Sequence, residues 1–180
     1  MLSQLIKAGI IPKLGRFGKD LPRRANADAQ YGLGYMYGEG KGEEKNDVKF
    51  VKWMKLAADN GHCRAPFWVG FDSVWGLGPS RWDEAAKWYR LSADRGDPEA
   101  QSDLANQYEH GEGVLQDYVQ AAHWYKLAAE QGNDTAQELL ADMYEDGRGV
   151  KQDFVQAHKW YNISATTPLK KQLGGFTERH

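Results

Sequence analysis

The chain has 180 residues, of which 41% are hydrophobic and 27% are charged, and its formal net charge at pH 7 is −2. Its seven Trp and nine Tyr exclude an intrinsically disordered chain, and no apolar stretch approaches the roughly 20 residues of a membrane-spanning helix. The single Cys excludes an intramolecular disulfide, and the net charge disfavours a nucleic-acid-binding protein, which needs a cationic surface.

Charge is distributed unevenly along the chain. Residues 1–25 carry a net charge of +5, residues 166–180 carry +2, and the intervening segment therefore carries −9. This asymmetry predicts a basic N-terminal arm, residues 1–26, followed by an acidic body and by a C-terminal tail at residues 169–180.

The N-terminal arm has a short apolar face. Leu2, Leu5 and Ile6 are spaced for one side of a helix that ends before Pro12, and we expect this helix to cap the body. Contact with a membrane surface, a targeting segment and disorder remain alternatives. Lys7 interrupts the apolar run that a secretory signal requires, so we expect a cytoplasmic protein.

The segment after the arm is an internal repeat with a period of about 36 residues. Three kinds of marker keep the same register: Trp53, Trp88, Trp124 and Trp160; Ala29, Ala65, Ala100 and Ala136; and the glycine pairs 40/42, 76/78, 111/113 and 147/149. Because independent markers do not stay in register by chance, we predict four units with the bounds 27–62, 63–97, 98–133 and 134–168.

Each unit is interpreted as two helices, and the third unit has the clearest pattern. Asp97 as N-cap and Pro98 at the first helical position predict a helix start, and the apolar residues of 100–108 recur at helical spacing. A turn follows at 111–113, and Asp117 is placed to cap a second helix. The other units repeat this arrangement.

A single helix pair cannot bury its own apolar face, so the units must stack. We therefore predict an all-α fold, an α/α solenoid of about four helix-turn-helix repeats in a right-handed superhelix. Large side chains of the second helices, such as Trp124, are expected to fill the space between layers. Small residues on the first helices let neighbouring helices approach closely: Gly34, Gly70, Ala105 and Ala141.

The unit resembles the Sel1-like repeat, a relative of the tetratricopeptide repeat. The resemblance rests on stretches such as Gly-Glu-Gly-Val-Leu-Gln-Asp-Tyr at 111–118 and Gly-Arg-Gly-Val-Lys-Gln-Asp-Phe at 147–154, and it covers residues 27–165. It implies a solenoid that serves as an adaptor or scaffold, and a bacterial source. Unit four lacks the closing glycine, and we expect Thr166-Thr167-Pro168 to end it.

A partner surface is predicted on the first helices, which line the concave face in tetratricopeptide solenoids. On each first helix, the second, third and sixth positions after the marker Ala point away from the core stripe. Apart from Gly32, these positions are aromatic in the first two units, and apart from Leu139 they are polar or acidic in the last two. The candidate partner-binding residues are Tyr31, Tyr35, Phe67, Trp68, Phe71, Asp103, Asn106, Glu138 and Asp142.

The sequence is compatible with more than one occupant of this surface. The aromatic half suits an apolar peptide or helix, and the acidic half suits a basic flank. Internal packing of the same aromatic side chains is the alternative, as is occupation of the groove by the chain's own N-terminal arm.

No catalytic constellation, metal-ligand spacing or phosphate-binding loop is present, and we predict neither a cofactor nor a metal. His62 and Cys63 are adjacent on one segment, so they do not form a nucleophile–base pair from separate elements. The function expected is a non-enzymatic scaffold that binds a protein or peptide partner as a monomer, with end-to-end self-association as an alternative.

The resemblance to the family also suggests two alternative functions. One is a toxin-neutralising immunity protein or a virulence-associated binding protein. The other is an enzyme that binds or hydrolyses β-lactams, because some disulfide-bridged members of the family are linked to that activity. The single Cys here cannot form those bridges.

Overall fold

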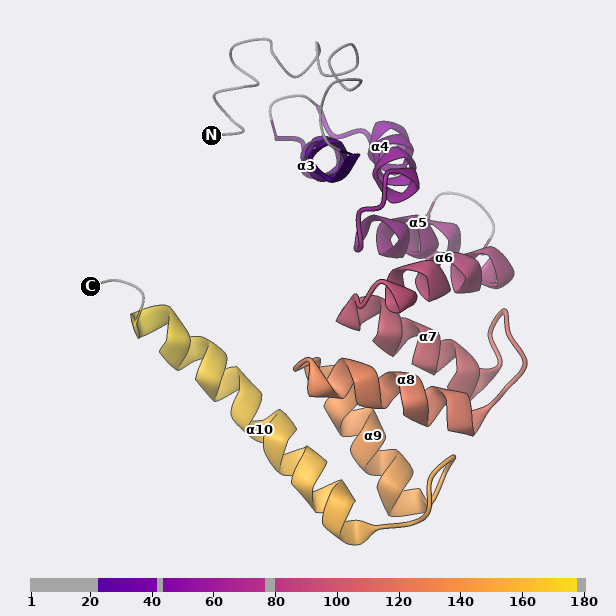
Figure 1. Ribbon diagram of the computed structural model, residues 1–180, viewed down its shortest axis with the longest axis vertical. Coiled ribbons are helices and arrows are strands. Elements are labelled where there is room, and N and C mark those ends of the chain that lie inside the picture. The colour runs from indigo at the N-terminus through magenta and orange to yellow at the C-terminus, as the bar shows by residue number, and fades with distance from the viewer. Residues whose placement is uncertain (1–22, 42–43, 77–79, 178–180) are drawn as a thin grey trace.

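The computed structural model describes residues 23–41, 44–76 and 80–177, with side chains described from 26 to 166 within those ranges. This part of the chain contains eight helices and no strand (Figure 1). The predicted N-terminal cap lies outside the described residues. The helices are α3 (Arg23–Glu39), α4 (Asp47–Asp59), α5 (Ala65–Trp75), α6 (Trp82–Asp94), α7 (Pro98–His110), α8 (Tyr118–Glu130), α9 (Asp134–Asp146) and α10 (Phe154–Thr177).

The helices pack as four successive pairs, α3–α4, α5–α6, α7–α8 and α9–α10. Each pair stacks on the next through its second helix, so that α4 contacts α5, α6 contacts α7, and α8 contacts α9. Figure 1 shows the pairs arranged along an arc from α3 to α10. The prediction of an all-α solenoid with about four helix-turn-helix repeats is confirmed.

Local signals place the helix ends as predicted in the third and fourth repeats. The side chain of Asp97 accepts hydrogen bonds from the N–H groups at the start of α7, Asp117 does so for α8, and Asn133 for α9. Each helix pair is also closed by a backbone hydrogen bond of 2.9 Å. In the four pairs, the N–H groups of Asn46, Arg81, Asp117 and Asp153 donate to the carbonyl oxygens of Tyr37, Ser73, Tyr108 and Tyr144, respectively.

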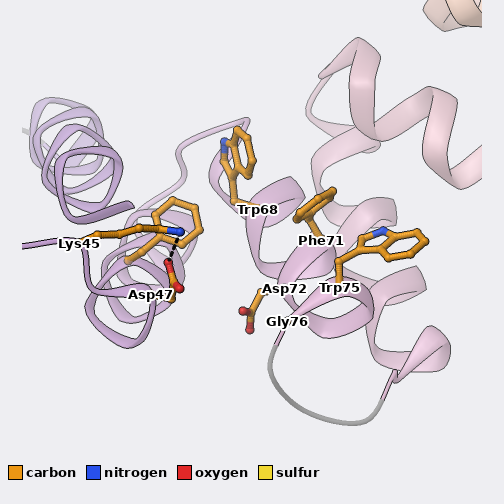
Figure 2. A pocket seen from close by; sticks show the side chains of 8 residues that line it. Lys45, Asp47, Trp68, Phe71, Asp72, Trp75 and Gly76 are labelled. Carbon is orange, nitrogen blue, oxygen red and sulfur yellow. Dashed lines mark ion pairs between the residues drawn. The ribbon is translucent and has the colours of Figure 1, made fainter. Parts of the chain in front are cut away.

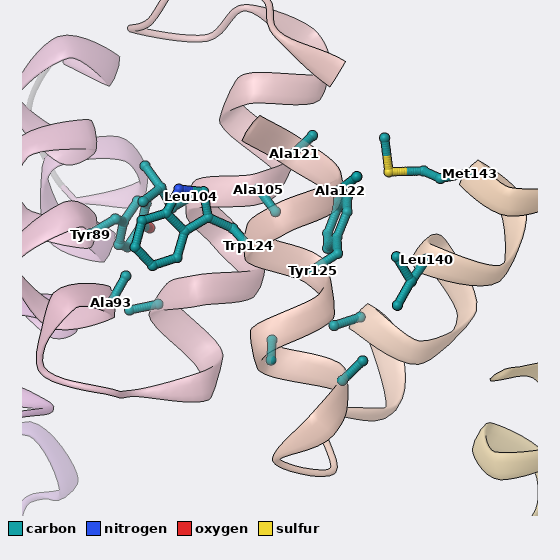
Figure 3. Packing of buried hydrophobic residues seen from close by; sticks show 14 of the residues in the cluster. Tyr89, Ala93, Leu104, Ala105, Ala121, Ala122, Trp124, Tyr125, Leu140 and Met143 are labelled. Atoms are coloured by element: carbon teal, nitrogen blue, oxygen red, sulfur yellow. The ribbon is translucent and has the colours of Figure 1, made fainter. Parts of the chain in front are cut away.

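The core runs between the layers of helices. Trp124 and Tyr125 of α8 lie inside it, between the side chains of α6 and α7 on one side and those of α9 on the other (Figure 3). The small residues have the predicted role. At Gly70, an added Cβ would lie 2.9 Å from the ring of Tyr89, so a larger residue would push α5 away from α6.

Buried glutamines join consecutive repeats. Gln101 at the start of α7 donates to the carbonyl oxygen of Ala93 at the end of α6, and Gln137 donates equivalently from α9 to Ala129 of α8. Each glutamine is thus a second donor to a carbonyl oxygen that already accepts the N–H of the glycine after the helix, Gly96 or Gly132.

The junction between the first two repeats uses a different donor. Pro66 occupies the glutamine position in α5 and has no amide side chain. Instead, Arg95 Nη1 donates to the carbonyl oxygens of Ala58, at 3.1 Å, and His62, at 3.0 Å. The arginine after α6 therefore replaces the missing glutamine.

The first and last helices extend beyond the predicted bounds of the repeats. Helix α3 begins at Arg23, before the expected boundary at residue 26, and α10 continues to Thr177 rather than ending at Thr166-Thr167-Pro168. A proline removes one backbone donor from a helix interior. Because the following residues 169–173 are good helix formers, the helix continues beyond Pro168.

Candidate functional site: an aromatic groove

A groove opens between the start of α4 and the exposed side of α5 (Figure 2). Its volume is about 260 Å³. We call it the aromatic groove, because four of the side chains that line it are aromatic. It is lined by Lys45, Asp47, Phe50, Trp68, Phe71, Asp72, Trp75 and Gly76.

Helix α5 places three aromatic side chains along one face. Trp68, Phe71 and Trp75 are spaced i, i+3 and i+7, which brings them to the same side of a helix. Their ring centroids are 6.0 Å apart for Trp68 and Phe71 and 6.5 Å apart for Phe71 and Trp75. Phe71 is 41% exposed and Trp75 is 67% exposed, so the row faces solvent.

Neighbouring elements fix the first member of this row. The indole N–H of Trp68 donates to the hydroxyl of Tyr31 in α3 at 3.2 Å, and its ring meets Phe50 of α4 edge to face at 5.8 Å. Tyr31 in turn stacks on His62 with 4.1 Å between ring centroids. The Nδ1 atom of His62 accepts from the N–H of Ala65, which begins α5. The position of Trp68 is therefore fixed by contacts with α3 and α4, and α3 also contacts His62 in the segment before α5.

Two carboxylates lie in the groove. Asp47 forms an ion pair with Lys45 at 3.4 Å. Partial burial raises the pKa of Asp72, and repulsion from Asp47 acts in the same direction, whereas Lys55 and Arg81 oppose the shift. Within the described part of the chain, the Asp72 carboxylate forms no ion pair or side-chain hydrogen bond. Among the described residues, Lys55 and Arg81 therefore act on the Asp72 carboxylate only from beyond ion-pair distance.

The predicted aromatic residues are partly brought together. Tyr31 and Tyr35 stack at 6.5 Å in α3, and Tyr31 contacts Trp68, which lies next to Phe71. Phe67 is a correction to the predicted surface, because it is only 9% exposed and packs against Tyr89 of α6. Helix α5 is covered by α4 on one side and by α6 on the other. More of its circumference is therefore buried than the row of residues in line with Ala65 indicates.

The predicted polar residues in α7 face neighbouring helices. Asp103 forms a hydrogen bond with the Tyr89 hydroxyl, and its burial raises its pKa to about 6, with repulsion from Glu99 adding to the shift. Asn106 forms a hydrogen bond with the hydroxyl of Tyr125. Neither residue lines the aromatic groove.

The predicted acidic residues in α9 bond to α10. Glu138 accepts a hydrogen bond from Ser164 Oγ at 2.9 Å, and Asp142 accepts one from the hydroxyl of Tyr161. The structure therefore separates these residues from the aromatic groove, which lies in the first two repeats.

Several groove residues were not predicted. Trp75 is the tenth residue after the marker Ala65, a position that points between those of Trp68 and Phe71, so helical periodicity would have found it. Phe50 and Asp47 belong to a second helix, and no pattern within one helix indicates that α4 and α5 share a groove.

The described residues also bear on metal binding and on membrane-spanning helices. No group of three His, Cys, Asp or Glu side chains gathers there to hold a metal ion. None of the helices described is both long and apolar enough to cross a membrane.

Together, the repeated helix pairs and the groove between two of them define an α-solenoid repeat protein. The family model described as "Sel1 repeat" matches residues 27–62, 83–97, 98–133 and 135–166. The chain belongs to the Sel1 repeat family, whose members generally mediate protein–protein interactions on a scaffold fold. The matched stretches leave out residues 63–82, which include α5.

Solved structures support the same assignment. A Sel1 repeat protein from Oxalobacter formigenes is 39% identical with a TM-score of 0.72, and the match covers 78% of this chain and 58% of that one. A protective antigen of uropathogenic Escherichia coli with an SLR fold is 33% identical with a TM-score of 0.75, over 86% and 32% of the two chains. The chain thus spans less than two thirds of either protein.

A more distant match shows the fold alone. An immunity protein from Pseudomonas aeruginosa is 18% identical with a TM-score of 0.52, and the match covers 88% of this chain and 57% of that one.

Proposed function

We propose that this protein is a non-enzymatic adaptor and that it binds a protein or peptide partner through the aromatic groove. The observation that carries the proposal is the solvent-facing row on α5, in which Trp75 is 67% exposed and Phe71 is 41% exposed. Exposed aromatic clusters mark interaction sites, and Trp and Tyr are enriched among the residues that dominate binding energy.

The family comparison adds a second argument for this location. Helix α5 falls in the stretch that the repeat model does not match, although the helices around it do match. Its departures from the repeat pattern include Trp68 and Phe71 at positions that are Asp103 and Asn106 in the third repeat. Trp68 and Phe71 line the groove, and α5 still contacts α4 and α6.

The test is co-purification from the native host with a doubly substituted chain. We choose Phe71→Ser/Trp75→Ser, because these side chains face solvent, whereas Trp68 bonds to Tyr31 and supports the fold. Phe154→Ser/Val155→Ser is the matched control, since that pair is 64% and 77% exposed in another repeat.

We expect wild type and the control to retain the same partner, identified by mass spectrometry, and the groove variant to lose it. Circular dichroism must show equal helix content in all three proteins. The adaptor would use another surface if the folded groove variant captured the partner as well as wild type does.

A further inference from the structure

We propose that the aromatic groove binds the guanidinium group of an arginine presented by the partner protein. This inference rests on the proposed function and specifies the chemistry that the groove recognises. The argument combines the two carboxylates of the groove with the aromatic walls around them.

The carboxylates make the groove attractive to a cation. Asp72 is partly removed from water, and burial outweighs the opposing charges of Lys55 and Arg81, neither of which lies within ion-pair distance; repulsion from Asp47 adds a smaller effect. Figure 2 shows Asp47 at the start of α4, with Lys45 next to it, and Asp72 on α5, with its carboxylate on the side of α5 that faces α4. A positive charge placed beside Asp72 would offset its desolvation and reduce the repulsion between the two aspartates.

The walls favour a guanidinium over an ammonium. Aromatic faces attract cations, and the planar guanidinium stacks on rings while it donates to carboxylates. Phe50, Trp68 and Phe71 line the same groove as the two aspartates and supply such rings. A lysine ammonium is a compact, strongly hydrated ion and gains less from such stacking.

The size of the groove fits a single side chain. Its volume of about 260 Å³ is below the range of about 300–1,000 Å³ that is usual for small-molecule sites. The chain's own cation at this point, Lys45, is already paired with Asp47, and its side chain is 64% exposed. Arg81 is likewise paired, with Glu84, and Lys55 forms no ion pair with Asp72, so the described residues leave Asp72 available to an incoming arginine.

The experiment selects peptides from a phage-displayed library of random heptapeptides on the full chain. The phage pool is first depleted on Phe71→Ser/Trp75→Ser, so that the peptides retained depend on the groove. The best peptide is then synthesised with arginine or with citrulline, which has the same shape but no charge. Affinities are measured by calorimetry for wild type, for Asp72→Asn and for the control Asp94→Asn, which removes an exposed carboxylate from α6.

We expect the selected peptides to contain arginine, and both citrulline and Asp72→Asn to weaken binding about tenfold, whereas Asp94→Asn leaves it unchanged. Lys45→Ala is expected to preserve or strengthen binding. Groove-dependent peptides that lack arginine, or that bind equally well with citrulline, would overturn this inference and leave the proposed function intact. A library without any groove-dependent peptide would count against both.

Discussion

Replacing Gly113 by alanine should separate the second and third repeats. Gly113 has a φ of +72°, and a Cβ there would overlap the backbone carbonyl of Trp82 in α6 and lie 2.7 Å from the nitrogen of Asp83. Real Cβ atoms essentially never approach another atom to within 3.0 Å. Because these atoms belong to the backbone, no side-chain rotation relieves the overlap.

A second glycine provides the matched control. Gly132 has a φ of +85°, and a Cβ there would meet no atom within 4 Å. Alanine at this position is destabilising only because of the left-handed backbone conformation, which costs about 1–2 kcal/mol. Alanine at Gly113 has the same backbone cost, and the overpacked contact with α6 adds about 1–3 kcal/mol. We therefore expect Gly113→Ala to lower the free energy of unfolding by about 2 kcal/mol more than Gly132→Ala does.

Urea denaturation followed by circular dichroism measures the difference. With a denaturant slope of about 2 kcal/mol per molar, the midpoint of Gly113→Ala should lie about 1 M below that of Gly132→Ala. Gly149→Ala should behave like Gly113→Ala, because its Cβ would overlap the carbonyl of Tyr118. Equal midpoints for Gly113→Ala and Gly132→Ala would refute the close backbone contact between repeats.

Other substitutions test the junctions and the core. Arg95→Ala should lower the free energy of unfolding by about 1–2 kcal/mol through loss of its backbone hydrogen bonds, and adding Pro66→Gln should recover part of this in a double-mutant cycle. Trp124→Ala should cost about 3–5 kcal/mol in thermal or urea unfolding, since it empties a core site, and a loss below 1 kcal/mol would contradict that role. Asp103 has a pKa near 6 in the folded state, above its ordinary value of 3.8, so its stabilising contribution is present at low pH and lost as pH rises through 6. Asp103→Asn should therefore be more stable than wild type by about 1–3 kcal/mol at pH 8, with the difference vanishing near pH 4 in urea titrations.

Much of the fold follows from local sequence signals. The register of Trp and Ala markers predicts the four repeats, and Asp97, Asp117 and Asn133 cap the helices that follow them. Helix α10 shows the limit of such signals. The cost of Pro168 within a helix is finite, and the residues that follow favour the helix.

The groove was harder to predict, because it depends on contacts between helices. A helical projection indicates that Phe67 points away from the marker stripe, but α6 covers this side of α5 and buries the ring. The same projection correctly places Trp68 and Phe71 beside each other. The pairing of Phe50 with Trp68 joins two repeats and is encoded in neither helix alone.

The replacement of a glutamine by Arg95 makes the junction between the first two repeats chemically unlike the next two. At the later junctions, the donor belongs to the incoming first helix, so that helix must keep its glutamine. At the first junction, the donor is Arg95, which follows α6, so α5 does not need a side-chain donor to the preceding helix. The helix that carries the groove is thus also the one whose N-terminal side chain is not needed to hold the stack. A solenoid organised in this way can vary one helix for recognition while the remaining units maintain its length and curvature.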